Sequence, residues 1–315
     1  MHLSLFIPKA VAALYLPSLA DLTLIHMPGT HHHHPFHLPL SGGRSLAPRA
    51  AMLVMGILNV TPDSFSDGGT FFQGTSAVDH AMEMLEQGAD VIDVGGESTR
   101  PGAELVDVAT ELERVIPVIV EIRRRSDVAI SVDTRKAAVA RAALESGADM
   151  VNDVSALRTD PALADVVRDH DVPVILMHMR GEPESMQTDI HFSNLMGEIS
   201  QELTERVELA VSLGIPREKI LVDPGIGFGK TFDQNLEILA RAGELSDVAP
   251  VVLGASRKAF IGKITGREGG AARAAGSLAA VASARLSGAA IVRVHDVAQT
   301  VDFLKVFDGI LAGAR

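Results

Sequence analysis

Polar or charged side chains stand at the end of each of eight short apolar runs in this chain. They are Asn59; Glu97, Ser98, Thr99 and Arg100; Asp133; Asn152 and Asp153; His178; Asp223; Ser256, Arg257 and Lys258; and Arg293 and His295. A single Asn, Asp or Ser at such a place is often only a helix cap. The cations in the set are not caps, because the helix dipole disfavours positive charge at a helix N-terminus. The set therefore predicts a functional site.

Cations gather after the last two of these runs. Arg257 and Lys258 follow the seventh run, and Arg293 and His295 follow the eighth. Arginine presents a planar fork to phosphate oxygens, and lysine presents a compact point charge. The whole chain carries a net charge of −12. A local concentration of positive charge on such a chain favours an anionic ligand, such as a phosphate ester or a diphosphate.

Acid and amide side chains follow three of the other runs. Asp133, Asn152 and Asp223 could read the ring N–H and amino groups of an aromatic heterocycle, as acidic side chains read nucleobases. A buried polar network that only holds the fold together explains these residues equally well. A metal site is a third alternative. No His-rich ligand set accompanies the carboxylates, which alone suit Mg²⁺, and Asn59 would stand near an Mg²⁺ that bridges a diphosphate.

The elements that position these side chains repeat one pattern from residue 51 onward. A run of Val, Ile, Leu and Met is followed by a polar or Gly-rich turn and then by an amphipathic stretch. The runs are 52–60, 90–96, 128–133, 149–154, 172–178, 219–224, 250–256 and 289–295. The helical candidates are 76–87, 108–124, 136–146, 161–170, 192–213, 233–242, 273–286 and 297–311, and glycines at 88, 147 and 288 mark helix ends.

This alternation predicts a (β/α)8 barrel, the TIM-barrel fold. Nearly continuous apolar strands separated by helices indicate a parallel sheet that is covered on both faces. Eight such units over residues 51–315 match the size of a barrel. A doubly wound open sheet is the alternative, but no G-x-G-x-x-G follows the first run. In barrels the site lies at the C-terminal ends of the strands, and phosphate often binds after strands 7 and 8.

Composition excludes several classes of function. The chain has 315 residues, of which 47% are hydrophobic and 22% charged, as in a well-buried globular protein. It has no cysteine, so disulfides and thiolate chemistry are excluded. The net charge of −12 argues against a nucleic-acid partner. No run is long enough to span a membrane, and we predict a cytoplasmic protein.

We predict that residues 1–50 form a partly disordered N-terminal extension and that the barrel spans residues 51–315. Its apolar run AVAALYLP is too short for a signal peptide. Four histidines at 31–34 could bind a metal, although such terminal runs usually have no specific role. Residues 36–47 could form a small hairpin that leads into the barrel.

The chain resembles the dihydropteroate synthase family over essentially all of residues 51–315. The resemblance is carried by MGILNVTPDSFSDGG, DVGGESTRPGA, SVDT, VND, LMHMRGEPESMQ, DPGIGFGKTFDQN, SRKAFIG, GSLA and IVRVHDV, in that order. It implies condensation of 6-hydroxymethyl-7,8-dihydropterin diphosphate with p-aminobenzoate, by a dissociative (SN1-like) mechanism with Mg²⁺. It also implies a homodimer joined through late helices.

The resemblance assigns roles to individual residues. The pterin would be bound by Asp133, Asn152, Met177, Asp223, Phe228, Lys258 and Arg293, with the Arg293 guanidinium stacked on the ring. The diphosphate would be held by Asn59, Thr99, Arg100, Arg293 and His295, with Asn59 also reaching Mg²⁺. The catalytic residues would be Asp133, Lys258, Arg293 and Asn59.

Two loops would close over the site and form the p-aminobenzoate pocket. The residues implied for this pocket and its loops are Phe65, Asp67, Arg100, Pro101, Ser256 and Arg257. Phe65 would face Pro101 as a wall of the pocket, which explains a large apolar ring in a polar, glycine-ended loop. The alternative is that Phe65 packs into a local apolar cluster.

The chain departs from the family pattern at two positions. Ala259 stands where many relatives carry a hydroxyl residue that can bind the p-aminobenzoate carboxylate. Ala272 precedes Arg273 where relatives often have a glutamate. Neither change affects a predicted diphosphate or pterin contact, so the departures concern p-aminobenzoate affinity more than activity.

Two other functions remain open. Methyltransferases that act on methyl-tetrahydrofolate share a pterin-binding barrel but have no need of cations for a diphosphate. A non-catalytic paralogue that only binds pterin should have lost loop residues, and Arg100 and the Phe65 loop are both present. These features favour the synthase.

Overall fold

The computed structural model describes residues 36–48, 51–61, 70–98, 105–181, 186, 188 and 190–314, and for residues 70–75 only the backbone. The predicted disordered extension up to residue 35, with its four histidines, lies outside these ranges. So do five of the predicted site residues, namely Phe65, Asp67, Thr99, Arg100 and Pro101.

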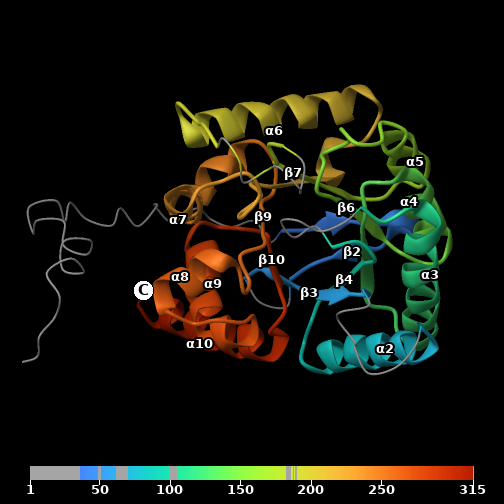
Figure 1. Cartoon of the computed structure of the whole chain (residues 1–315), viewed down its shortest axis with the longest axis horizontal. Helices are drawn as coiled ribbons and strands as arrows, with labels where there is room; N and C mark the ends of the chain where they lie inside the picture. The colour runs from blue at the N-terminus through green and yellow to red at the C-terminus, as the bar shows by residue number, and fades with distance from the viewer. Residues whose placement is uncertain are drawn as a thin grey trace, which may run out of the picture. The chain divides into compact units, whose positions relative to one another are not determined.

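Within the described ranges, eight parallel strands form a barrel (Figure 1). They are β3 (Leu53–Asn59), β4 (Val91–Gly95), β5 (Ala129–Asp133), β6 (Met150–Asp153), β7 (Val174–Met177), β8 (Ile220–Asp223), β9 (Val252–Leu253) and β10 (Ile291–Val294). Their hydrogen-bonded order is β8-β7-β6-β5-β4-β3-β10-β9. One bridge between Val222 and Val251 brings β9 back to β8. The predicted (β/α)8 barrel is confirmed.

Helices surround the strands (Figure 1). They are α2 (Thr70–Glu86), α3 (Val108–Arg125), α4 (Ala137–Glu145), α5 (Leu163–Asp169), α6 (Leu195–Ser212), α7 (Phe232–Arg241), α8 (Ala259–Thr265), α9 (Ala274–Leu286) and α10 (Val297–Gly313). Short 3-10 turns lie at Ser41–Gly43, Arg217–Lys219, Ala242–Asp247 and Ala271–Arg273. The short helix α8 was not predicted, and α2 begins at Thr70 rather than at residue 76. No helix in the described ranges combines the length and the apolar character that a bilayer crossing requires.

Local signals fix where several helices begin and end. The Asp107 side chain accepts an N–H of the first turn and caps α3, and Thr231 opens α7 with a capping box. Gly88, Gly147 and Gly288 follow α2, α4 and α9 with φ angles of 99°, 110° and 77°. This left-handed conformation suits a glycine that ends a helix, so the three predicted helix ends are confirmed.

Alternate residues of each strand point into the barrel and toward the helices. Leu53 and Met55 of β3 belong to an apolar cluster inside the barrel. Val54, which stands between them, belongs to the larger cluster shared with the helices. The other strands contribute Val91, Ala129, Met150, Ile175, Leu221, Val252 and Ile291 to the interior cluster. Side chains in a strand alternate with a period of two. The next inward residue of each strand therefore lies one layer closer to the C-terminal ends.

A hairpin before the barrel completes the interior cluster. Strands β1 (Leu38–Pro39) and β2 (Ser45–Leu46) pair antiparallel. Leu38 and Leu40 are both buried in the interior cluster. The Arg44 guanidinium lies 2.6 Å from the Asp149 carboxylate, at the start of β6. The compact unit accordingly begins at Phe36, so the hairpin packs with the barrel.

Candidate active site

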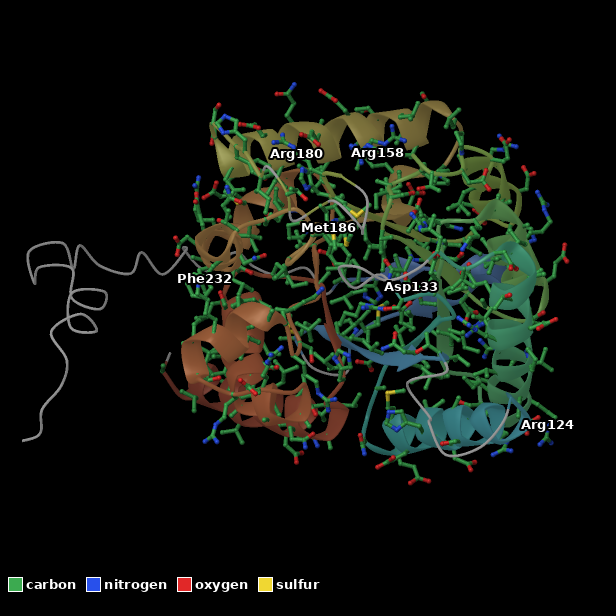
Figure 2. The ribbon with its side chains drawn as sticks, viewed as in Figure 1. Arg124, Asp133, Arg158, Arg180, Met186 and Phe232 are labelled. Atoms are coloured by element: carbon green, nitrogen blue, oxygen red, sulfur yellow. The ribbon has the colours of Figure 1, made fainter. Side chains whose placement is uncertain are left out.

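A mostly polar layer of the barrel interior carries four of the predicted site residues, Asn152, Met177, Asp223 and Arg293. Asp93, Ser131, Asn152, Met177, Asp223, Gly254 and Arg293 each stand two residues beyond a member of the interior apolar cluster on the same strand. Asp133 stands two residues beyond Ser131. The two-residue period of the strands thus stacks a mostly polar layer on the interior apolar layer, on the side of the strand C-termini. Figure 2 shows Asp133 amid the strands, whereas Arg124 lies at the outer edge of the molecule.

These residues line one cavity at the C-terminal ends of the strands. Its lining residues are Asp133, Asn152, Val154, Met177, Asp223, Ile226, Phe228, Gly254, Lys258 and Arg293. All seven residues predicted to contact a pterin are among them. They come from β5, β6, β7, β8, β10 and the segments after β8 and β9. The structure therefore brings together residues that lie up to 160 positions apart.

Arg293 joins two buried carboxylates in the middle of this cavity. Its Nε lies 2.5 Å from Asp93 Oδ2, and its Nη2 lies 2.7 Å from Asp133 Oδ2. Asn152 Nδ2 donates to the same Asp93 oxygen at 3.2 Å. Burial acts to lower the pKa of Arg293, but the charges of Asp93 and Asp133 raise it above its ordinary value. The guanidinium stays charged and holds both acids in fixed positions.

Asp93 is the member of this group that the sequence analysis missed. It lies inside the strand VIDVG rather than at its end, and it is fully buried. The available signal was a lone carboxylate within an otherwise apolar run, because a charge is almost never fully buried unless it is paired. Asp93 positions Arg293 and Asn152 from below.

Burial raises the pKa values of the two carboxyl groups that line the cavity. For Asp133 the pKa reaches about 7, with burial as the main cause and the Arg293 cation opposing it. Burial also raises the pKa of Asp223, whose Oδ1 accepts the Gly225 N–H at 2.7 Å. Buried acids with nearby cations are typical of functional sites.

An apolar wall with a cation on it faces these acids. Val154, Met177, Met186 and Phe228 form a separate apolar cluster beside the cavity. The Lys258 Nζ lies 4.3 Å from the centroid of the Phe228 ring. Apolar side chains together with carboxylate and amide groups in one cavity suit a planar heterocycle with several N–H groups.

Comparison with known proteins now identifies the family. The profile of the pterin binding enzymes matches residues 55–295 of the chain. The chain belongs to the pterin-binding enzyme family. This confirms the resemblance that the motifs indicated.

Named relatives of this pterin-binding enzyme are dihydropteroate synthases. The one from Synechocystis is 47% identical over 258 residues, which cover 82% of this chain and 89% of that protein. The one from Escherichia coli is 45% identical over 260 residues, which cover 82% of this chain and 92% of that protein. These matches span nearly the whole length of both relatives.

Solved structures of this group share the fold. Dihydropteroate synthase from Xanthomonas albilineans with 4-aminobenzoic acid superposes with a TM-score of 0.82 at 47% identity, covering 88% of this chain and 99% of that chain. The same protein in complex with 7,8-dihydropteroate gives a TM-score of 0.79 at 44% identity, with the same coverage. The Yersinia pestis enzyme with a sulfonamide drug gives 0.81 at 41% identity, also over 88% and 99% of the two chains.

The other basic side chains after β9 and β10, Arg257 and His295, are arranged differently from Lys258 and Arg293, which line the cavity. The Arg257 guanidinium makes a two-pronged contact with Asp296, at 3.0 Å and 2.5 Å. Its backbone has a φ of 58°, and its N–H donates to Ser277 Oγ at 2.9 Å. The Ser256 hydroxyl accepts the His295 N–H at 3.1 Å. Of the predicted set, Arg257, Ser256 and His295 are thus not among the residues that line this cavity.

The remaining predicted residues stand at the ends of β3 and β4. Asn59 ends β3 and is half-buried, opposite Gly95 of β4. After β4, the Glu97 carboxylate lies 2.7 Å from Lys136 Nζ and 3.1 Å from Arg135 Nη2, and it accepts the Val106 N–H at 3.2 Å. Glu97 therefore fixes the chain on both sides of the segment that carries Thr99, Arg100 and Pro101.

Proposed function

We propose that this chain condenses 6-hydroxymethyl-7,8-dihydropterin diphosphate with p-aminobenzoate and releases 7,8-dihydropteroate and diphosphate. The chain is then a transferase of folate biosynthesis, a dihydropteroate synthase. The observation that carries the proposal is one cavity lined by Asp133, Asn152 and Asp223 together with Phe228, Lys258 and Arg293. The named relatives at 45–47% identity support the same reaction.

The proposed mechanism is dissociative. The bond between the pterin methylene carbon and the diphosphate oxygen breaks first, and its electron pair leaves with diphosphate. The resulting cation is delocalised into the pterin, and the p-aminobenzoate nitrogen then attacks the methylene carbon and loses a proton. No general base is required, because an aniline is a neutral nucleophile at pH 7. The main task of the site is electrostatic.

Asp133 and Arg293 supply the electrostatics in this proposal. Ionised Asp133 stabilises the pterin cation, and the Arg293 guanidinium stacks on the ring and reaches toward the diphosphate. Arg293 occupies Oδ2 of Asp133, so a pterin N–H would be accepted by Oδ1. Lys258 and Asp223 hold the opposite edge of the ring.

Mg²⁺ fits this site only as a companion of the diphosphate. The described residues contain no group of three His, Asp or Glu side chains that could hold a metal ion. Mg²⁺ commonly binds through one or two protein oxygens and substrate phosphates, and Asn59 would supply the protein oxygen. The ion would neutralise charge on the departing diphosphate. His295 with Thr99 and Arg100 would hold the same group.

The p-aminobenzoate pocket stays a proposal that the family resemblance supports. It assigns the pocket and its closing loops to Phe65, Asp67, Arg100 and Pro101, next to Ser256 and Arg257. The cytoplasm as location and the absence of a nucleic-acid partner are retained as proposals from the composition.

Diphosphate release tests the activity. Protein supplied with pterin diphosphate, Mg²⁺ and p-aminobenzoate is expected to release diphosphate and form dihydropteroate in equal amounts. Turnover should stop without p-aminobenzoate and should collapse in Arg100→Ala. Tight binding of pterin diphosphate without release would contradict the proposal and leave a pterin-binding protein. Methyl transfer from methyl-tetrahydrofolate would instead favour the methyltransferase.

We also propose a homodimer joined through α9 and α10. Val306 and Ile310 are 65% and 61% exposed and stand four residues apart, on one face of α10. Leu286 at the end of α9 is 46% exposed. Exposed apolar side chains that share a helix face are typical of an interface.

Replacing Val306 by Glu is expected to shift the protein from dimer to monomer in sedimentation velocity, because the carboxylate would have to be buried unpaired. Leu209→Glu is the matched control, since Leu209 is 38% exposed on α6. A wild type that sediments as a monomer at all concentrations would rule the dimer out.

A further inference from the structure

Lys230 is a buried cation between two walls of the pterin cavity. It is 2% exposed, and its Nζ donates to Phe228 O at 2.9 Å and to His178 O at 3.1 Å. Phe228 lines the cavity, and His178 directly follows Met177, which also lines it. One ammonium group therefore ties the backbone of one wall to the backbone of the other.

The two walls approach each other backbone to backbone at this place. Gly225 has a φ of +69°, and a Cβ on it would lie 2.0 Å from His178 O. Gly229 has a φ of +62°, and its Cβ would lie 2.6 Å from Arg180 O. Carbonyl oxygens gathered so closely need hydrogen-bond donors. Lys230 supplies them from the side.

The third contact of Lys230 fixes the state of a buried histidine. Its Nζ lies 2.9 Å from His178 Nδ1. When Lys230 is charged, this nitrogen is the acceptor, because an ammonium group has only donors. The hydrogen is then on Nε2, which lies 3.3 Å from Glu202 Oε2. Burial and the Lys230 cation lower the pKa of His178 to about 4, so the ring is neutral at pH 7.

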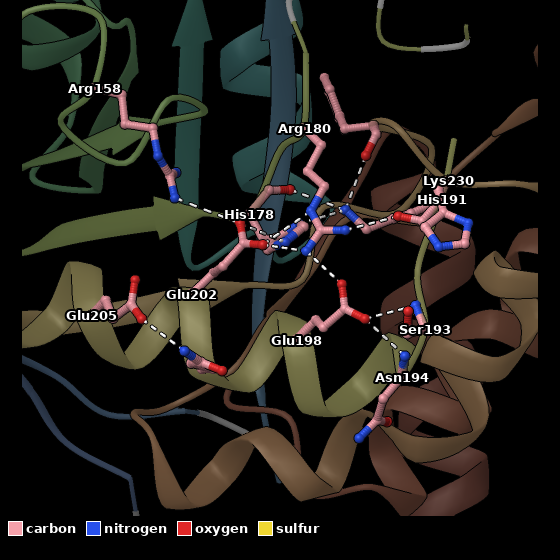
Figure 3. Close-up of polar contacts among 12 residues, drawn as sticks. Arg158, His178, Arg180, His191, Ser193, Asn194, Glu198, Glu202, Glu205 and Lys230 are labelled. Carbon is pink, nitrogen blue, oxygen red and sulfur yellow. Dashed lines mark hydrogen bonds and ion pairs between the residues drawn. The ribbon is translucent and has the colours of Figure 1, made fainter. Parts of the chain in front are cut away.

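Glu202 connects this pair to helix α6. Its carboxylate also contacts the Arg180 guanidinium, whose Nε lies 3.0 Å away. Arg180 in turn reaches Glu198 at 2.8 Å. Figure 3 shows the resulting row of side chains from Lys230 through His178 and Glu202 to Arg180 and Glu198. Contacts to His178 and Arg180 lower the pKa of Glu202 to about 2 against the effect of burial, which keeps it charged.

We propose that Lys230, oriented by His178 and Glu202, is a positioning residue that sets the spacing between the Met177 wall and the Phe228 wall. Through Phe228 it also sets where the Lys258 ammonium lies, 4.3 Å from the ring centroid. The inference rests on the proposed function for its substrate, a pterin diphosphate. Lys230 itself does not line the cavity.

Burying the charged Lys230 side chain costs free energy, and filling the same space does not require a charge. Burial lowers the pKa of Lys230 to about 7, with Asp223 and Glu202 opposing and Arg180 and Lys258 adding to the effect. An apolar side chain of the same length would avoid that cost. What it would lose is the pair of hydrogen bonds to the two walls.

Two variants and one control test the proposal. Lys230→Met keeps the length and removes the charge and the donors. Glu202→Gln keeps an oxygen toward His178 Nε2 and removes the charge. Glu205→Gln is the control, because Glu205 is exposed on the same helix and accepts a hydrogen bond from Gln201 Nε2 at 3.0 Å. For each protein we would measure Kd for pterin diphosphate by calorimetry, and KM for p-aminobenzoate at saturating pterin diphosphate.

Lys230→Met should raise Kd for pterin diphosphate by about 10- to 100-fold, the range expected for lost hydrogen bonds to a charged group. KM for p-aminobenzoate should stay within about twofold of wild type, because neither Met177 nor Phe228 is among the residues assigned to the p-aminobenzoate pocket. Glu202→Gln should shift Kd for pterin diphosphate in the same direction by a smaller factor, and Glu205→Gln should leave both constants unchanged.

Parallel changes in both substrates' constants would indicate general loosening and would overturn the proposal, as would wild-type pterin affinity in Lys230→Met. If Lys230→Met does not fold, unchanged pterin affinity in Glu202→Gln overturns it. Because Kd does not depend on turnover, the comparison is separate from the activity test. A wild type that binds pterin diphosphate without releasing diphosphate contradicts the proposed function alone.

Discussion

Asp133→Asn is expected to lower the rate of diphosphate release by about 10²- to 10³-fold, the effect of removing one electrostatic stabiliser of a transition state. The amide keeps the shape of the side chain and can still accept a hydrogen bond through its oxygen, but it cannot balance a cation in the pterin ring. Single-turnover release with saturating pterin diphosphate measures this effect directly. Asp302→Asn, at a 78% exposed side chain on α10, is the matched control.

The pH dependence of the same step tests the role of Asp133 in a second way. Burial raises its pKa from 3.8 to about 7. The folded protein therefore binds this proton more tightly than the unfolded chain does. The resulting stabilisation is fully present below about pH 3.8 and is lost as the pH rises through 7. Catalysis needs the ionised form, so kcat/KM for pterin diphosphate should fall below about pH 7 in the wild type.

The acid limb of this profile should disappear in Asp133→Asn. If it persists at the same pH, another group is responsible for it. A release rate within tenfold of wild type would remove Asp133 from the catalytic role.

The sequence predicted the barrel because its strands and helices have different periods. Apolar runs of the right length recur eight times, and each real strand lies inside a predicted run. The ends differ most at β9, where the predicted run 250–256 forms only Val252–Leu253. An apolar run shows which residues are buried. The length of the strand depends instead on backbone hydrogen bonds to the neighbouring strands. Helix α8 was missed because its seven residues are too few to show a helical period.

The site was predictable where it depends on strand ends alone. Asp133, Asn152, Asp223 and Arg293 lie at or next to the C-terminal ends of parallel strands of one barrel, so the sequence could place them at the same mouth. Asp93 was missed because it lies in the middle of β4 (Val91–Gly95) rather than at the end of the strand.

Pairings between distant side chains could not be read from the sequence at all. Arg257 looks like one more cation for the ligand, but its guanidinium contacts Asp296, 39 residues later. His178 was noted as a strand-end residue, yet its partner Lys230 follows 52 residues later. Tertiary packing decides which distant side chains come into contact, and no local sequence pattern indicates these pairs.

Arg293→Met is expected to have the largest effect on stability of any change in the site. It would leave Asp93 and Asp133, which are 0% and 9% exposed, without the cation that now contacts both. Removing one partner of a buried ion pair typically lowers the free energy of unfolding by about 3–5 kcal/mol, because the remaining charge stays buried. We expect a loss of this size for Arg293→Met. Urea unfolding at pH 7 measures the loss. Diphosphate release should also fall, by at least about 10²-fold.

The double variant Asp93→Asn/Arg293→Met separates the buried charge from lost packing. With one of the two carboxylates made neutral, part of the stability lost in Arg293→Met should return, and the recovery measures the coupling between the residues.

Lowering the pH should have the same effect on Arg293→Met, because protonation of Asp133 also removes a buried charge. The charge of Arg293 lowers the pKa of Asp133, so removing this cation should raise that pKa. The window in which stability rises with falling pH should therefore extend to higher pH than in the wild type. If Arg293→Met instead unfolds at the wild-type urea concentration and gains nothing from acid, the two carboxylates do not depend on Arg293, and its role is limited to the substrate.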